Sequence, residues 1–125
     1  MTDEDVLQLA DRLFTAIEAG DLAAVDACYT EDVVVWGNYD GRERDKAASM
    51  RLLGWLCDRL TGRRYEVRRR IVIPGGFLQE HVLCGLAPDG TAVAMPACIV
   101  AEVADGRITR MNEYLDPAGI AALSR

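Results

Sequence analysis

The spacing of hydrophobic positions changes once along the chain, near residue 61. Before that point, apolar residues recur every three to four positions in the segments 4–18, 22–28 and 43–60, which predicts three helices. A β-branched and aromatic run at 33–39 predicts one strand between the second and third helices. Afterwards apolar and polar residues alternate between glycine-containing turns, which predicts four more strands. These strands are residues 65–73, 77–86, 92–103 and 107–115.

This order of elements predicts a single α+β domain over residues 1–125. Three helices with one inserted strand precede a four-strand antiparallel meander, and the tail at 118–123 could form a short helix. The length fits one domain, and no internal repeat or linker interrupts it. Half of the residues are hydrophobic, so the chain can bury a core and is not expected to be disordered.

Charge excludes some classes of partner. The 20 acidic residues outnumber the 14 basic residues, giving a net charge of -6, which argues against nucleic-acid binding. No apolar run approaches the ~20 residues that a membrane-spanning helix needs, and the start of the chain is acidic, unlike a signal peptide. We therefore expect a cytoplasmic protein without a membrane partner.

The cysteines and the single histidine also limit the kinds of site that we expect. The four cysteines are widely spaced without a C-x-x-C motif, and His81 is the only histidine, so we expect no metal site. Each cysteine has apolar neighbours, so we expect buried free thiols, as suits a reducing compartment.

A cluster of arginines stands out in this acidic chain, at positions 63, 64 and 68–70. Strict strand alternation places Arg68 and Arg70 on one face, and Arg69 on the other with Val67 and Ile71. We expect a solvated or dimer-facing sheet surface, since binding of an anion would need Arg69 to point inward.

Polar residues inside otherwise apolar strands are the candidates for chemistry. Gln79 and His81 share a strand face with Phe77 and Leu83, and Glu113 shares a face with Met111 and Leu115. An unpaired polar group in a core costs a few kcal/mol, so such residues should be exposed, paired or lining a cavity. If the sheet wraps around a cavity, Asn38, Gln79, His81 and Glu113 could converge there.

Three stretches of the sequence carry a family resemblance: the hairpin at 103–116 (VADGRITRMNEYLD), the helical entry at 14–25, and Tyr39-x-Gly41-Arg42. Together they resemble the nuclear transport factor 2 (NTF2)-like superfamily, particularly its SnoaL-like, limonene-epoxide-hydrolase-like and ketosteroid-isomerase-like branches. The resemblance implies a cone-shaped fold with three N-terminal helices packed on a strongly curved, mostly antiparallel sheet. It also implies an apolar pocket and a homodimer formed through the sheet.

The epoxide-hydrolase pattern is only partly present. That branch has Tyr-x-Asn on the first strand, where this chain has Trp36-Gly37-Asn38. Its Arg-x-Asp matches Gln79-Glu80-His81 here, and its last-strand Asp matches Glu113. If a catalytic acid exists, Glu113 must supply it.

Three function hypotheses follow. The first is a cofactor-free acid–base isomerase, cyclase or dehydratase, in which His81 and Glu113 form a catalytic dyad. Its substrate would be a hydrophobic, polyketide- or terpenoid-like carbonyl compound. The alternatives are an epoxide hydrolase and a non-catalytic ligand-binding or dimeric interaction module. The residues predicted to contact the substrate are Trp36, Asn38, Gln79, Met95 and Met111.

Overall fold

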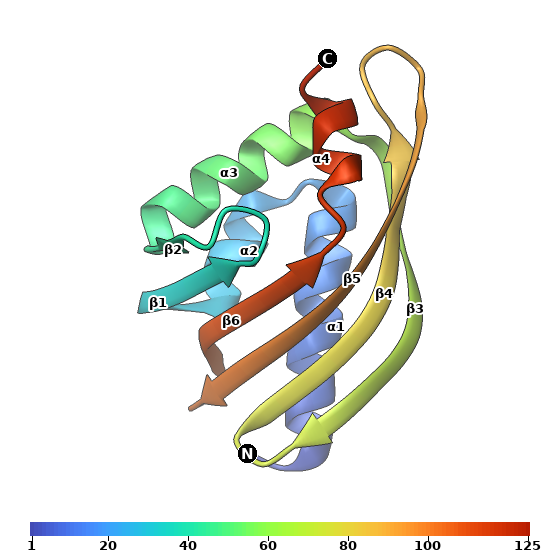
Figure 1. The fold of residues 1–125 in the computed structure, drawn as a ribbon. Helices are drawn as coiled ribbons and strands as arrows, with labels where there is room; N and C mark the ends of the chain where they lie inside the picture. The colour runs from blue at the N-terminus through green and yellow to red at the C-terminus, as the bar shows by residue number, and fades with distance from the viewer.

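The computed structural model describes residues 1–125 and contains four helices and six strands. The helices are α1 (Asp3–Ala19), α2 (Leu22–Cys28), α3 (Lys46–Arg59) and α4 (Ala118–Leu123). The strands are β1 (Tyr29–Gly37), β2 (Glu43–Arg44), β3 (Thr61–Ile73), β4 (Gly76–Leu86), β5 (Ala92–Ala104) and β6 (Arg107–Leu115). The predicted elements are present, with the two-residue β2 in addition (Figure 1).

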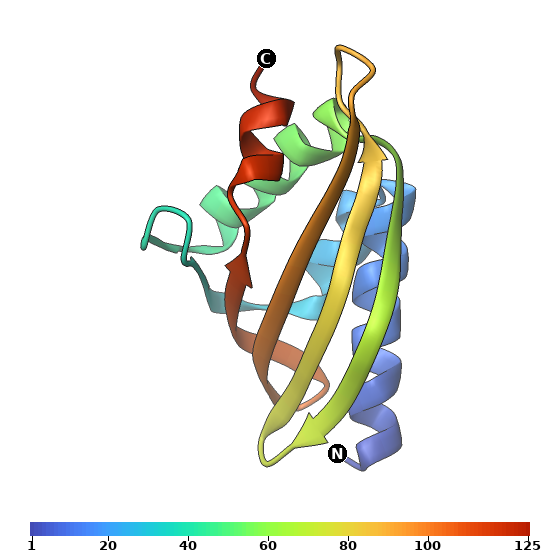
Figure 2. The same cartoon turned by 45° about the vertical axis from the view of Figure 1, so that its right-hand side comes forward.

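One curved, unclosed sheet forms the body of the molecule, in the strand order β2-β1-β6-β5-β4-β3. Strands β3 to β6 form the predicted antiparallel meander, and β1 adds to β6 as the only parallel pair. Figure 2 shows the long strands bending around α1, while α3 and α4 lie at one end. The predicted α+β class, with N-terminal helices packed on a strongly curved sheet, is confirmed.

The helix ends follow the local sequence signals. Thr2 and Asp5 form a reciprocal capping box at the start of α1, and Gly20 ends that helix in the left-handed conformation at φ 70°. Asp21 and Asp45 accept hydrogen bonds from the first turns of α2 and α3. These caps determine the residues at which the three helices begin.

Two apolar clusters pack on the inner face of the sheet. The larger joins α1 and α2 to the strands, and Leu9, Leu13, Phe77 and Ile108 within it are fully buried. The smaller lies at the α4 end, around Leu60, Leu83, Met95 and Leu123. The inner face is thus covered by helices at both ends, and the candidate site lies between the clusters.

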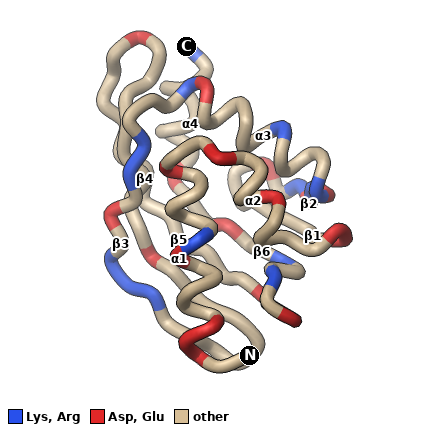
Figure 3. The backbone as a smooth tube through the Cα atoms, turned by 180° about the vertical axis from the view of Figure 1, so that it is seen from behind, with Lys and Arg blue, Asp and Glu red and all other residues tan.

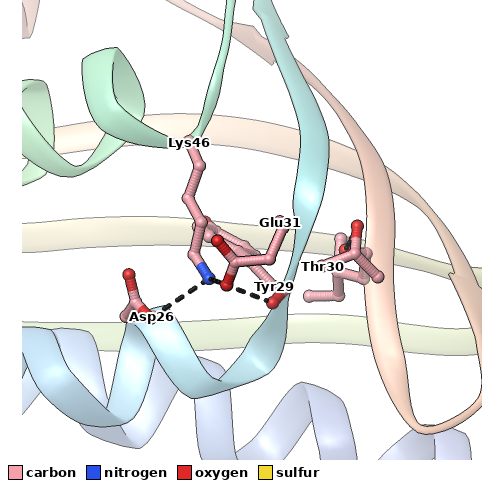
Figure 4. Close-up of polar contacts among 6 residues, drawn as sticks. Asp26, Tyr29, Thr30, Glu31 and Lys46 are labelled. Carbon is pink, nitrogen blue, oxygen red and sulfur yellow. Dashed lines mark hydrogen bonds and ion pairs between the residues drawn. The ribbon is translucent and has the colours of Figure 1, made fainter.

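Strand β1 starts at Tyr29, four residues earlier than predicted. The polar residues Thr30–Asp32 suggested a break, but they belong to the strand. Lys46, the only lysine, lies 3.1 Å from Asp26 and 3.0 Å from Glu31, and it donates to the carbonyl of Tyr29 (Figure 4). These contacts connect the start of β1 to the last turn of α2 and to the first residue of α3.

A β-bulge at Arg68 changes the predicted orientation of the arginine cluster. Val67 pairs with His81, but Arg69 pairs with Glu80, so Arg68 is the extra residue. The bulge turns Arg69 to the outer face, where it forms an ion pair with Glu80, and turns Arg70 to the inner face. We predicted that Arg69 lies on the same strand face as Val67. That prediction was wrong, because strict alternation does not hold across a bulge. Figure 3 shows basic residues along β3.

Candidate active site

A cavity of about 150 Å³ lies between the inner face of the sheet and helices α1, α3 and α4. Of its 25 lining residues, 20 are hydrophobic. A dry apolar cavity of this size holds a ligand such as benzene, so the enclosed space fits one small ring. The few polar groups on its wall therefore determine what it can do chemically.

Glu113 supplies the only carboxyl group on the cavity wall. It lies on the inner face of β6, where it pairs with Gly37 of β1 on one side and Ile99 of β5 on the other. Its carboxyl group makes no hydrogen bond or ion pair with the protein. Burial among apolar neighbours raises the pKa of Glu113 to about 7. At neutral pH this group can therefore either accept or donate a proton.

His81 lines the cavity from β4 and is 3% exposed. Its ring lies edge-on to Phe14 and to Tyr65, at centroid distances of 5.5 and 4.7 Å. Burial, with a smaller contribution from the positive charge of Arg70, lowers the pKa of His81 to about 4. The imidazole is therefore neutral at physiological pH, and it is a poor base there.

A chain of hydrogen bonds sets the tautomer of His81. Arg70 Nε donates to Gln79 Oε1 at 2.6 Å, which orients the amide of Gln79. The amide nitrogen then faces His81 Nδ1 at 2.9 Å and must donate to it. The proton of the neutral ring consequently resides on Nε2, which has no partner in the protein. His81 thus offers a neutral N–H donor at the cavity wall.

His81 and Glu113 line the cavity from the same inner face of the sheet, on β4 and β6. Glu113 pairs with Ile99, Ile99 with Gln79, and Gln79 with Arg70, so these residues form one row across the sheet. His81 lies in the next inward-facing row, two strands across and two residues along from Glu113, which separates their Cα atoms by about 12 Å. No hydrogen bond joins the two, and both side chains line the same cavity.

The structure separates the other predicted substrate contacts into two groups. Met95 and Met111 line the cavity. Trp36 borders it, but its ring stacks edge-on against Tyr114, which is 47% exposed. Asn38 and Gln79 do not line the cavity. The side-chain amide of Asn38 donates to the carbonyl of Leu115 and accepts from its N–H, which extends the β1–β6 pairing. Gln79 is fully buried and hydrogen-bonds to His81 Nδ1.

Two tyrosines that the sequence interpretation did not select also line the cavity. Tyr29 and Tyr65 have side chains whose pKa values are raised, first by burial and second by the charge of Glu113. Both phenols therefore interact electrostatically with the carboxylate of Glu113, and both stay protonated at neutral pH. Tyr65 was visible as the only aromatic residue in the predicted 65–73 strand, whereas Tyr29 lies between the predicted helix at 22–28 and the predicted strand at 33–39.

The family comparison agrees with this fold and cavity. The family model for the SnoaL-like domain matches residues 10–111. The chain belongs to the SnoaL-like domain family. No curated protein matches the sequence.

Solved structures match the whole SnoaL-like domain. A protein assigned as a SnoaL-like polyketide cyclase from Shewanella putrefaciens is 12% identical with a TM-score of 0.81, over 99% of this chain and 98% of that one. An epoxide hydrolase of M. tuberculosis described as LEH-like is 24% identical with a TM-score of 0.77, over 98% and 91%. AclR of Streptomyces galilaeus, assigned as a hydroxylase, is 13% identical with a TM-score of 0.86, over 98% of both chains.

Identities this low establish a shared fold, and the predicted NTF2-like architecture is confirmed. The activity of this SnoaL-like domain has to be argued from its own cavity. None of its helices is both long and apolar enough to cross a membrane. Its His, Cys, Asp and Glu side chains form no group of three that could hold a metal ion.

Proposed function

We propose that this SnoaL-like domain is a cofactor-independent enzyme that moves a proton at a carbon next to a carbonyl group. One observation carries the proposal: Glu113 is a carboxyl without a protein partner in an apolar cavity, with a pKa of about 7. A general base is most effective when its pKa lies near the working pH. The cytoplasm, at near-neutral pH, is the compartment we propose for it.

In this proposal Glu113 and His81 have separate roles. Glu113 takes the proton from the carbon, and His81 Nε2–H donates a hydrogen bond to the carbonyl oxygen as negative charge develops there. Glu113, now protonated, returns the proton to another atom of the same substrate. This replaces the predicted dyad, because a neutral His81 with no bond to Glu113 acts as a donor and not as a partner base.

The cavity limits the substrate. Its apolar wall favours a hydrophobic carbonyl compound, and its volume of about 150 Å³ fits one ring. A larger polyketide- or terpenoid-like molecule would insert one ring and leave the rest outside. Isomerisation, ring closure and dehydration all begin with the same removal of a proton, so the first step can be tested without knowing the natural substrate.

The test is exchange of the α-protons of cyclohexanone for deuterium in heavy water, followed by NMR. We expect the wild-type protein to accelerate exchange, with a rate that rises as the pH passes through about 7 and Glu113 loses its proton. Glu113→Gln should remove about 10²–10⁴-fold of that acceleration. His81→Phe, which keeps a planar aromatic ring but removes the N–H donor, should remove about 10²-fold and leave the pH profile in place.

Glu102→Gln is the matched control, since Glu102 lies exposed near the far end of β5. It should exchange cyclohexanone at the wild-type rate. Equal rates in wild type and Glu113→Gln would overturn the proposal and leave a ligand-binding module as the better interpretation. Epoxide hydrolysis, the other alternative, would instead place labelled water oxygen in a diol product, with Glu113 activating the water.

We also propose that two copies associate through the outer face of the sheet. That face is not covered by helices, and it exposes Ile71 and Tyr114, which are 39% and 47% exposed. Ionic contacts such as Arg69–Glu80 lie beside these apolar residues.

A further inference from the structure

Two residues that line the cavity each carry a buried hydroxyl group without a hydrogen-bond partner. These residues are Tyr39, in the turn after β1, and Ser49 of α3. Ser49 is 8% exposed. Leaving a buried hydroxyl unpaired costs about 1–3 kcal/mol, and few native polar groups are left in this state. Two such groups in one cavity point to a ligand.

The position of Tyr39 is fixed by its neighbours. Its ring packs against Gly37, where an added Cβ would lie only 2.6 Å from the ring. The guanidinium of Arg44 lies 5.5 Å from the ring centroid on a cation–π contact and is itself paired with Asp40 at 2.7 Å. The phenol ring is thus held between a glycine and a neutralised arginine, and its buried hydroxyl has no hydrogen-bond partner.

Ser49 is oriented by its helix. A helical serine often bonds the carbonyl four residues earlier, which here is that of Asp45. That carbonyl accepts the backbone N–H of Ser49 at 2.9 Å, and the hydroxyl makes no bond to it. Ser49 lines the cavity on the side where α3 packs on β1.

These hydroxyls lie on the opposite side of Glu113 from His81. Gly37, beneath Tyr39, pairs directly with Glu113, and β1 is the neighbour of β6 on the side away from β4. The charge of Glu113 also contributes to raising the pKa of Tyr39, after burial and the charge of Asp40. The order across the cavity is therefore His81, Glu113, then the hydroxyls of Tyr39 and Ser49.

We propose that Tyr39 and Ser49 form a second polar subsite that binds a neutral oxygen group, a hydroxyl or a carbonyl, of the substrate. Both hydroxyls can donate and accept, and Arg44 beside them is neutralised by Asp40, so the subsite suits an uncharged group. The substrate is then a small ring with two oxygen functions at opposite ends. The carbonyl end rests on the proposed function, and the second end rests on the two hydroxyls alone.

The test compares binding of two probes, cyclohexanone and 4-hydroxycyclohexanone, by NMR titration of the ¹⁵N-labelled protein. A hydroxyl lowers affinity for an apolar cavity unless the cavity bonds it. We expect the wild-type protein to bind 4-hydroxycyclohexanone about tenfold more tightly than cyclohexanone, because the two hydroxyls hydrogen-bond its hydroxyl group. Tyr39→Phe and Ser49→Ala should each reduce that preference about fivefold while leaving the affinity for cyclohexanone within twofold of wild type.

Tyr114→Phe and Ser124→Ala are matched controls, because both residues are exposed and should keep the full preference. Binding is measured without turnover, so Glu113→Gln should also keep the preference for the hydroxylated probe even if it abolishes exchange. The subsite is overturned if wild type fails to bind 4-hydroxycyclohexanone saturably, binds both probes equally, or keeps its preference in both cavity variants. As a second readout, each cavity variant should be at least as stable as wild type without ligand, since it removes an unpaired buried hydroxyl.

Discussion

At the scale of single residues, the cavity holds two titratable groups whose pKa values move in opposite directions. Burial favours the neutral form of each, so the pKa of Glu113 rises to about 7 and that of His81 falls to about 4. Near neutral pH the histidine is neutral and the glutamic acid is close to half ionised. Because the two pKa values move apart, Glu113 is suited to transfer a proton near neutral pH and His81 is suited to donate a hydrogen bond without ionising.

The free energy of unfolding should change with pH as Glu113 gains or loses its proton. Its pKa rises from 4.5 to about 7 on folding, so the stability supplied by the bound proton is complete below pH ~4.5 and is lost as the pH rises to about 7. His81 has the opposite dependence, losing stability as the pH falls from 6.5 to about 4. Glu113→Gln removes only the first effect. We expect the variant to match wild type near pH 4 and to exceed it by about 3 kcal/mol at pH 8.

Urea denaturation of both proteins between pH 4 and 8 measures this difference. Glu102→Gln, an exposed substitution, should follow the wild-type curve throughout. Parallel curves for Glu113→Gln and wild type would mean that the carboxyl is solvated in the folded state, in conflict with its position in the cavity.

Alternation along strands was sufficient to predict that His81 and Glu113 face inward, because no bulge interrupts β4 and the bulge of β6 precedes residue 110. The role of Asn38 could not be read from the sequence. Whether an amide at a strand end faces a cavity or bonds a neighbouring backbone depends on the β1–β6 pairing, which joins residues 77 positions apart. The hydrogen bonds from Arg70 through Gln79 to His81 could not be predicted from the sequence either, because the bulge at Arg68 determines which face Arg70 occupies.

At the scale of elements, one arginine of the β3 cluster links two helices to the sheet. Arg63 donates to the carbonyls of Ile17 and Glu18 in the last turn of α1, and to those of Cys57 and Leu60 at the end of α3. Helix C-termini leave such carbonyls without intrahelical partners, and a cation there also opposes the helix dipole. A single guanidinium on β3 therefore bridges the C-terminal ends of α1 and α3.

Replacing this group should destabilise the fold. Arg63→Gln removes most of these charge-assisted bonds and leaves half-buried carbonyls unpaired, so we expect a loss of about 2–4 kcal/mol in the free energy of unfolding. Arg64→Gln is the control on the adjacent residue, where an exposed ion pair to Glu66 at 3.5 Å contributes less than about 1 kcal/mol. Chemical denaturation of the two variants distinguishes them. Equal losses would show that the bonds to the helix ends add little.

The element order was predictable because each helix has its own cap and each hairpin its own turn residues. The start of β1 was not predictable, because Thr30, Glu31 and Asp32 are poor strand formers. Their strand conformation depends on long-range contacts: Lys46 neutralises Glu31, and the Thr30 hydroxyl bonds the carbonyl of Ile108 at 3.3 Å. Figure 4 shows how these contacts gather at the start of the strand.

At the scale of the whole molecule, the helices cover one face of the sheet and leave the other open, as Figures 1 and 2 show. The outer face combines apolar residues with paired charges, and the aromatic contact between Trp36 and Tyr114 lies at its β1–β6 side. Trp36 also borders the cavity, so a partner on the outer face would support the cavity wall from behind.

The proposed dimer makes a prediction of its own. Sedimentation equilibrium at micromolar concentration should give twice the mass of one chain. Tyr114→Glu places a charge in the proposed interface and should weaken association at least tenfold, because a desolvated unpaired charge costs several kcal/mol. Leu7→Glu is the control, since Leu7 is a similarly exposed apolar residue, 37% exposed, on α1 away from the outer face. A monomeric wild type, or equal effects of the two substitutions, would contradict the interface. A monomeric Tyr114→Glu that still exchanges cyclohexanone at the wild-type rate would place the whole active site within one chain.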